Sequence, residues 1–442
     1  MPKTTQLQEI KFSEESLAII DLFQNSSENL FITGKAGTGK STLLKHIYSL
    51  NNSIILLAPT GIAAINVGGE TVHSFFRLKP GFELDEAKHV RIDKNTTARY
   101  APVNTIIIDE ISMIRADILD AIDVFLQRVK SSELPFGGVR MIFVGDLFQL
   151  PPVLMRDKKA EFLQEYESPY FFSAKVFEAK DLFSDPFVLR LCELQTIYRQ
   201  KDSKFTDLLN AIRTNTINDS QLAILNQQVK TDSDDDLRIN LVATNALALA
   251  INTKKLDSLD SDEIKFYASQ SGNIENLKPN EQQVTLKKGA QVIFINNDAL
   301  KRWVNGTIGK VLGESEEFDE ELDRTFPVLE VELENGKVVK VSPFTWEISK
   351  YVFKMGRFTR QEIGSFTQIP LKLAWAITIH KSQGKTFDKV KIDLGRGSFA
   401  HGQTYVALSR CKTLENVILA KPVKKSDVIT DQVVVDYFKA NT

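Results

Sequence analysis

The sequence is poor in cysteine and lacks long apolar runs. Its 442 residues include two cysteines far apart, Cys192 and Cys411, and five histidines that form no ligand cluster. Such cysteine usage fits a reducing compartment and excludes a cysteine-based zinc framework. No apolar run approaches the roughly 20 residues of a membrane span, and the N-terminus lacks the pattern of a signal or transit peptide. We therefore expect a cytoplasmic protein with no membrane partner.

An excess of charge of either sign is also missing. The formal net charge is −2 and the pI is about 6.3, which argues against a protein that coats nucleic acid non-specifically. A narrow basic channel remains compatible with this balance, because phosphates interact with the local field. The chain is too long for one ordinary core, so we expect two to four domains.

Short β-branched runs alternate with helical patterns over much of the sequence. Each run ends in Gly, Pro or an acid, which is typical of parallel strands covered on both faces. The first set is NLFITG, SIILLAP, NTIIIDE and RMIFVGD, and the second is RINLVATNALALAIN, KLAWAITIHKSQGKT, KVKIDLG and NVILAKP. The pattern predicts two tandem doubly wound α/β domains that bind a ligand at the carboxyl ends of their strands.

A different pattern interrupts the second set. Residues 281–368 form short alternating runs, and Asn335-Gly336 between two of them is a strong hairpin signal. We expect a small antiparallel, barrel-like β insert there, and a small excursion from the first sheet in a polar stretch. The predicted division is 1–76 and 101–185 for the first α/β domain, 77–100 for the excursion, 186–280 and 369–442 for the second α/β domain, and 281–368 for the insert.

The stretch GKAGTGKS (34–41) follows an apolar run and opens a helical pattern. It fits G-x-x-x-x-G-K-[ST], in which glycines let backbone N–H groups surround a phosphate at a helix N-terminus. Lys40 is expected at the β- and γ-phosphates of ATP and Ser41 at Mg²⁺. The order of run, loop and helix disfavours the alternative of a simple glycine-rich turn. The predicted nucleotide-binding residues are Gly34, Ala36, Gly37, Thr38, Gly39, Lys40, Ser41 and Thr42.

Polar residues end the two following strands. Asp109 and Glu110 close NTIIIDE, and we expect Asp109 to bind Mg²⁺ and Glu110 to orient the attacking water. Gln149, in VGDLFQLPPV (144–153), ends the next run at the same edge. We interpret it as a contact to the γ-phosphate or to the water, against the alternative of a residue that bonds its own turn.

Two arginines in the second half are candidates to neutralise the transferred phosphate. They are Arg199, in LQTIYRQ, and Arg410, in YVALSRCK. One arginine in this role is worth roughly 10³–10⁵ in rate, because its planar fork matches phosphate oxygens. Alone, each would be interpreted as a surface arginine. Together they suggest a nucleotide between two domains.

The motifs in this order resemble a superfamily-one helicase. They are GKAGTGKS, APTGIAAINVGGETVHSFF (58–76), IIIDEISM, VGDLFQLPPV, ITIHKSQGKTFDKV (377–390) and TYVALSRCK (404–412). LPFGGVRMIFVGDLFQLPPV (134–153) is similar to the stretch that distinguishes the petite-integration-frequency (Pif) family. The resemblance covers most of the chain. It implies a 5′→3′ DNA helicase with two RecA-like domains that acts as a monomer on single-stranded DNA and DNA junctions. The implied context is DNA repair, recombination and telomere maintenance, or the nucleoid if the protein is bacterial.

The resemblance also implies two sets of site residues. The ATP cleft would be lined by Gly37, Gly39, Lys40, Ser41, Asp109, Glu110, Gln149, Arg199, Gln383, Gly384 and Arg410. Single-stranded DNA would be faced by Thr60, Gly61, His73, Thr378, His380, Lys381 and Ser382. The chain departs from the family at Ser16, where relatives carry a glutamine that reads adenine, with Gln6 and Gln8 as nearby substitutes.

A basic stretch adds a second indication of a strand track. Residues 336–372 carry seven Lys and Arg against two Glu, interleaved with aromatics, as in a single-strand surface. The alternative is that most of these aromatics form the core of the insert. The excursion at 77–100 is a candidate wedge. Two further alternatives remain open, a translocase or RNA remodeller that does not unwind DNA, and a nucleotide-gated binding clamp.

Overall fold

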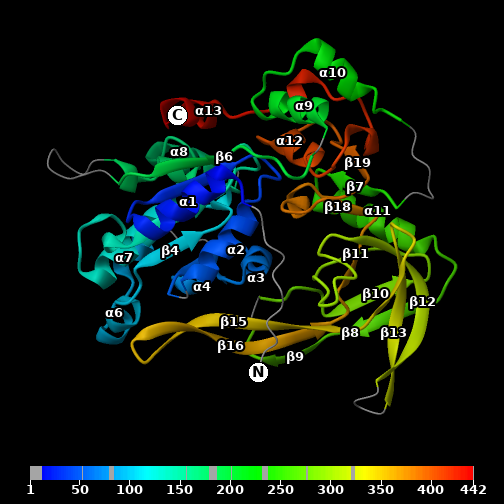
Figure 1. The fold of residues 1–442 in the computed structure, drawn as a ribbon, viewed down its shortest axis with the longest axis horizontal. Helices are drawn as coiled ribbons and strands as arrows, with labels where there is room; N and C mark the ends of the chain where they lie inside the picture. Colours follow the sequence, from blue (N-terminus) through cyan, green and yellow to red (C-terminus); the bar gives the residue numbers. More distant parts are fainter. Residues whose placement is uncertain are drawn as a thin grey trace.

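The computed structural model describes residues 12–51, 53–78, 84–155, 157–178, 187–200, 202–230, 237–274, 277–319 and 324–441. Two parallel sheets and a group of antiparallel strands make up its architecture (Figure 1). We call the parts around the two parallel sheets the first and second domains, and the antiparallel part the insert.

The first domain is built on a six-stranded parallel sheet. Its order is β3 (Glu70–Thr71), β2 (Ile55–Ala58), β4 (Thr105–Ile108), β5 (Arg140–Val144), β1 (Leu30–Gly34) and β6 (Arg190–Leu194). Alternate side chains enter two cores, with Phe31 on one face and Leu30 and Ile32 on the other. This alternation confirms that the apolar runs are strands covered on both faces.

Helices cover both faces of this sheet. One core includes side chains of α1 (Glu14–Asn25), α2 (Lys40–Leu50) and α3 (Gly61–Val67), and the opposite core includes α7 (Ala116–Lys130). Shorter helices complete the first domain, α4 (Val72–Phe75), α5 (Leu84–His89), α6 (Lys94–Tyr100) and α8 (Lys159–Glu165). The described part of the predicted excursion contains α5 and α6. Arg128 of α7 donates to the Ala87 carbonyl at 2.6 Å, so this part packs on α7.

The second domain has a four-stranded parallel sheet. Its order is β18 (Ala376–Thr378), β7 (Ile239–Val242), β19 (Val390–Asp393) and β20 (Val417–Leu419). The core on one face includes α9 (Ser203–Arg213), α10 (Asp219–Asn226) and α12 (Gln403–Leu408), and α11 (Asn245–Asp257) packs on the other face. Two parallel α/β domains are thus confirmed.

The last helix, α13 (Gln432–Asn441), packs against the first domain. Phe438 stacks on Phe148 with ring centroids 5.2 Å apart, and Tyr437 stacks on Phe172 at 4.3 Å. Val434 is fully buried in the core of the first domain. The C-terminal segment therefore connects the two domains a second time.

The insert is antiparallel, as predicted. A five-stranded sheet has the order β14 (Val338–Val341), β13 (Arg324–Leu333), β12 (Ile308–Asp319), β11 (Gln291–Phe294) and β17 (Leu371–Leu373). A three-stranded sheet joins β15 (Phe344–Lys354), β16 (Arg357–Gln368) and β9 (Ser269–Gly272), and β10 (Gln283–Lys287) pairs with β8 (Glu263–Tyr267). Because the described strands are distributed over separate sheets, a closed barrel is not confirmed.

The hairpin signal at Asn335-Gly336 is confirmed. β13 and β14 pair in antiparallel register on either side of it, and Gly336 has φ of +76°. That conformation is strained for residues with a Cβ, which explains the glycine.

Most aromatics of the basic stretch have structural contacts. Trp346 and Phe366 are buried in a small core of the insert, and Tyr351 and Phe358 pack against Phe75 of the first domain. Phe344 is 37% exposed. The alternative interpretation, that these rings are mainly core, therefore agrees better with the packing. Figure 1 shows β15 and β16 extending beneath the first domain.

Candidate functional site: a nucleotide cleft between two domains

The phosphate loop lies between β1 and α2. Gly37 and Gly39 both have φ of +85°, and a Cβ on Gly37 would lie 2.5 Å from the Arg199 Cβ. The Lys40 Nζ donates to the carbonyls of Gly34 and Lys35 at 2.6 and 3.0 Å. Burial lowers the pKa of Lys40, and the carboxylates of Asp146 and Glu110 oppose this shift. The Lys40 ammonium therefore bonds carbonyls of its own loop and lies near the carboxylates that follow β4 and β5.

Ser41 and Thr42 are in the first turn of α2 directly after Lys40, and Thr38 donates its hydroxyl to the Lys35 carbonyl at 3.0 Å. Backbone N–H groups in a first helical turn lack partners within their helix and attract anions. The local conformation thus suits a phosphate, as the motif predicts.

Asp109 and Glu110 follow the buried strand β4 at the same edge. Burial raises the pKa of both carboxyls, and Glu110 further raises that of Asp109. The Lys40 ammonium and the Arg410 guanidinium lower the pKa of Glu110, which brings groups of both domains to one place. Glu110 has φ of +50°, an uncommon conformation for a residue with a side chain. Such conformations cluster at functional sites.

Gln149 is buried beside the acids of this edge. Its Nε2 donates to Asp146 Oδ2 at 3.2 Å, and its backbone N–H donates to the Asp146 carbonyl at 3.0 Å. Asp146 in turn pairs with Arg213 of α9 at 3.1 Å, and both side chains are almost fully buried. Gln149 therefore bonds its own turn, as the alternative interpretation has it, through a carboxylate that is paired with the second domain. Its contact with the γ-phosphate or the water stays a prediction.

The two predicted arginines lie close together at the boundary between the two domains. Arg199 donates from Nη1 to the Ser409 carbonyl at 3.1 Å. Arg410 is 1% exposed, and its guanidinium donates to the Val406 carbonyl at 2.9 Å and to the Ser409 hydroxyl at 2.7 Å. Burial, followed by the nearby Arg199 guanidinium, lowers the pKa of Arg410. Since a buried cation is costly without an anion, this pair suits an anionic ligand.

Gln383 supplies a direct test of whether a ligand fits. Its side-chain Nε2 is buried without a hydrogen-bond partner, next to Gly384 at φ of +73°. An unpaired buried donor costs about 1–3 kcal/mol, which a bound acceptor would offset. The raised pKa of Asp109 likewise favours a bound dication, which would relieve the repulsion by Glu110. The residues present therefore fit ATP with Mg²⁺.

Two tyrosines of the cleft were missed by the sequence analysis. The Ala36 backbone N–H of the phosphate loop donates to the Tyr405 hydroxyl of α12 at 2.9 Å. Tyr198 donates its backbone N–H to the Gly37 carbonyl at 2.9 Å, and a Cβ on Gly39 would lie 3.6 Å from its ring. Their only signal was their place beside the arginine motifs, in IYRQ and TYVALSR.

The residue at the expected adenine position is buried and bonds at the start of its own helix. Ser16 lies 4% exposed in α1, and its hydroxyl lies 3.0 Å from that of Ser13. Gln6 and Gln8 lie outside the described residues.

The residues predicted to face DNA divide into two groups. Thr60 and Lys381 are exposed, Gly61 opens α3, and His73 and His380 are half-buried with pKa values lowered by burial. Thr378 and Ser382 are buried, and they bond within their own turn, to the Lys381 N–H at 3.3 Å and the Ile379 carbonyl at 2.7 Å. These two therefore shape the turn, and their contact with DNA stays a prediction.

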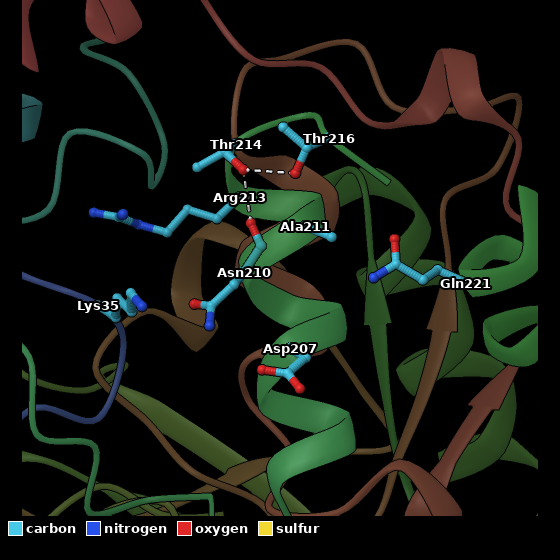
Figure 2. A pocket seen from close by; sticks show the side chains of 8 residues that line it. All are labelled: Lys35, Asp207, Asn210, Ala211, Arg213, Thr214, Thr216 and Gln221. Carbon is cyan, nitrogen blue, oxygen red and sulfur yellow. Dashed lines mark hydrogen bonds between the residues drawn. The ribbon is translucent and has the colours of Figure 1, made fainter. Parts of the chain in front are cut away.

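A cavity of about 320 Å³, lined mostly by residues with polar side chains, lies along α9 and includes Lys35 of the phosphate loop (Figure 2). Its lining residues are Lys35, Asp207, Asn210, Ala211, Arg213, Thr214, Thr216 and Gln221. Figure 2 shows the Arg213 side chain extending away from the α9 axis on the side of Lys35. The cavity therefore adjoins the nucleotide cleft without containing its carboxylates.

Fold and cleft together define a phosphate-loop nucleotide hydrolase with its site between two parallel α/β domains. A family model described as PIF1-like helicase matches residues 12–223. An ATP-dependent DNA helicase Pif1 of Bdellovibrio bacteriovorus is 34% identical over 441 residues, covering 98% of this chain and 92% of that protein. The chain belongs to the PIF1-like helicase family.

Solved structures of Bacteroides sp. Pif1 are similar over 98% of this chain and 97% of theirs. The complex with ADP-AlF4 superposes with a TM-score of 0.85 at 35% identity, and the unliganded protein with 0.84 at 36%. The form bound to single-stranded DNA gives 0.67 at 35%. The present arrangement is thus more similar to the first two structures than to the DNA-bound one.

No helix in the described part of the chain has the length and apolar character needed to cross a membrane. Within that part, no cluster of three or more His, Cys, Asp or Glu side chains is placed to hold a metal ion.

Proposed function

We propose that this chain is an ATP-dependent DNA helicase that moves 5′→3′ along single-stranded DNA and opens duplexes at forks and other junctions. The observation that carries the proposal is the contact of the second domain with the phosphate loop, where the Ala36 N–H donates to the Tyr405 hydroxyl of α12, the helix that precedes the buried Arg410. Such a cleft lets one nucleotide control the gap between two domains. The Bacteroides relative bound to single-stranded DNA supports the choice of nucleic acid.

The chain's own groups suggest the course of hydrolysis. Lys40 would exchange the carbonyls of Gly34 and Lys35 for β- and γ-phosphate oxygens. Ser41 and Asp109 would hold Mg²⁺, which would neutralise charge on the phosphate oxygens. Glu110 would orient the attacking water, because burial raises its proton affinity at the position where a base is needed.

The second domain would complete the site from the opposite side. Arg199 and Arg410 would neutralise charge on the transferred phosphoryl group and close the domains on the strand. Loss of this anion would leave two neighbouring guanidinium groups unpaired and so favour opening. Gln149 would sense that loss, because its side chain contacts Asp146, which pairs with Arg213 of α9.

Opening DNA costs little free energy per base-pair step. A base-pair step costs on average about 1.4 kcal/mol, so a modest wedge beside the strand track is sufficient. The excursion at 77–100 is our candidate for that wedge. We further propose that the protein acts as a monomer in the cytoplasm, or at the nucleoid in a bacterial cell.

A fluorescence unwinding assay tests the function. We expect the duplex with a 5′ single-stranded tail to be opened in the presence of ATP, and the 3′-tailed and RNA duplexes to remain closed. Unwinding of RNA alone would instead indicate an RNA remodeller, and translocation without unwinding would indicate a translocase. ATP hydrolysis that single-stranded DNA does not stimulate would indicate a binding clamp.

A further inference from the structure

The Tyr405 hydroxyl reaches the phosphate loop from the second domain. Tyr405 lies in α12 with 3% of its surface exposed, and its oxygen accepts the Ala36 backbone N–H at 2.9 Å. A phenolic hydroxyl can accept one hydrogen bond and donate another at the same time. Among the residues that the structure describes, none accepts the Tyr405 proton. The hydroxyl therefore offers a buried donor beside the loop that is expected to hold the phosphates of ATP.

The Tyr405 phenol is neutral and lies among arginines. Burial raises the pKa of Tyr405 to about 12, and the Asp146 carboxylate adds to the shift. The Arg213 and Arg410 guanidinium groups oppose it. Burial lowers the pKa of Arg199, and the nearby Tyr405 opposes that shift. The hydroxyl thus keeps its proton and lies near both arginines that are expected to neutralise the transferred phosphate.

The start of α12 is fixed on the first domain. The Asp431 N–H donates to His401 Nδ1 at 2.7 Å, so His401 carries its proton on Nε2 and donates to the Leu147 carbonyl at 2.7 Å. Gly402 follows at φ of +68°, and a Cβ there would lie 2.4 Å from a backbone carbonyl oxygen of the first domain. Tyr405 lies one helical turn further along, on the same side of the helix. Contacts one turn earlier therefore hold the Tyr405 ring against the first domain.

We propose that Tyr405 is a further catalytic residue, whose hydroxyl donates to a γ-phosphate oxygen of ATP while it accepts the Ala36 N–H. The proposal rests on the proposed function and adds a neutral donor from the second domain to the two arginines. The hydroxyl keeps its proton throughout, so no covalent bond to it forms or breaks during hydrolysis. ADP has no γ-phosphate to accept this hydrogen bond, so Tyr405 distinguishes ATP from ADP at the boundary between the domains.

Tyr405→Phe tests the proposal, because it removes the hydroxyl and keeps the ring. A hydrogen bond to a charged acceptor is strong enough to change an equilibrium constant by roughly tenfold to hundredfold. We expect the dissociation constant of AMP-PNP with Mg²⁺ to rise by about this factor, while that of ADP stays unchanged. The kcat/KM for ATP hydrolysis should fall by the same factor. Isothermal titration calorimetry with each nucleotide and a steady-state ATPase assay measure these values.

Tyr351→Phe is the matched control. The Tyr351 hydroxyl also accepts a backbone N–H, that of Leu56 at 3.0 Å, where the insert meets the first domain. This variant should leave both dissociation constants unchanged. Equal weakening of AMP-PNP and ADP binding in Tyr405→Phe would overturn the proposal, because Tyr405 would then only shape the loop. Unchanged affinity for AMP-PNP, or the same loss in Tyr351→Phe, would overturn it as well.

A spectroscopic measurement provides an independent arm. Should Tyr405→Phe fail to fold in a thermal scan, a ring-fluorinated tyrosine at position 405 keeps the hydroxyl. We expect its fluorine NMR resonance to shift when AMP-PNP replaces ADP, because the hydroxyl gains an acceptor. An identical resonance with the two nucleotides would overturn the proposal. Absence of ATP hydrolysis by the wild-type protein would contradict the proposed function itself, which is a separate outcome.

Discussion

The nucleotide cleft and the strand-facing side of the molecule are built by different means. The phosphate loop follows from eight consecutive residues, 34–41, because a strand, a glycine turn and a helix start suffice to form it. The opposite side joins α3, the turn at Lys381 and the insert, which lie more than 200 residues apart at their extremes. A site made of local backbone is readable from sequence, whereas a site made by domain placement is not.

Burial shows the same difference. Arg410 and Gln149 are 1% and 6% exposed, and each has hydrogen-bond partners in the folded protein. On the strand-facing side, Thr60 and Lys381 are exposed. The aromatics of the basic stretch, which could have stacked on bases, are mostly buried in packing contacts, as Trp346 and Phe366 are. Chemistry on phosphate thus has a preformed site, and the strand surface depends on how the insert docks.

The largest expected effect is at Lys40. Lys40→Ala removes the ammonium that meets the phosphates, so ATP hydrolysis should fall to background while single-strand binding persists. A steady-state ATPase assay and fluorescence anisotropy measure the two activities. Lys35→Ala, on the same loop, is the matched control and should retain most hydrolysis. Hydrolysis by Lys40→Ala at the wild-type rate would remove the basis for assigning the phosphate loop.

Arg410→Ala is expected to lower kcat for ATP by roughly 10³–10⁵. The cause is loss of the buried guanidinium that the second domain supplies. Lys412→Ala, which removes an exposed ion pair with Asp388, should leave kcat within twofold or so. Stopped-flow phosphate release measures both variants. A loss of similar size in the two would mean that Arg410 acts through folding alone.

Breaking the contact between the insert and the first domain should have a smaller but measurable effect on stability. The Leu56 N–H donates to the Tyr351 hydroxyl at 3.0 Å, and the Tyr351 N–H donates to Glu70 Oε2 at 2.8 Å. Tyr351→Phe leaves the buried Leu56 N–H unpaired, which should lower the free energy of unfolding by about 1–3 kcal/mol. Phe344→Leu, at an exposed ring of the same strand, should change it by less than about 0.5 kcal/mol. Urea titration distinguishes them, and equal values would show that the docking contact is weak.

Much of the fold was accessible from the sequence for a physical reason. Buried parallel strands must be continuous apolar runs, so β1, β2, β4 and β5 appeared as such. The cleft residues that belong to motifs were identified because phosphate chemistry needs glycine, lysine and carboxylate at fixed spacing. The hairpin at Asn335-Gly336 followed from turn chemistry.

The rest depended on long-range packing. Nothing local indicated that α13 returns to the first domain, because its apolar stripe fits any core. Tyr405 and Tyr198 touch the phosphate loop through chain distances that periodicity does not encode.

A crystal structure with Mg²⁺ and a non-hydrolysable ATP analogue tests the central claim most directly. We expect a guanidinium nitrogen of Arg199 and one of Arg410 to lie within about 3.2 Å of γ-phosphate oxygens, with Lys40 moved from the Gly34 carbonyl to the phosphates. Guanidinium groups still bonded to the Ser409 and Val406 carbonyls, with the triphosphate held by the first domain alone, would contradict the account.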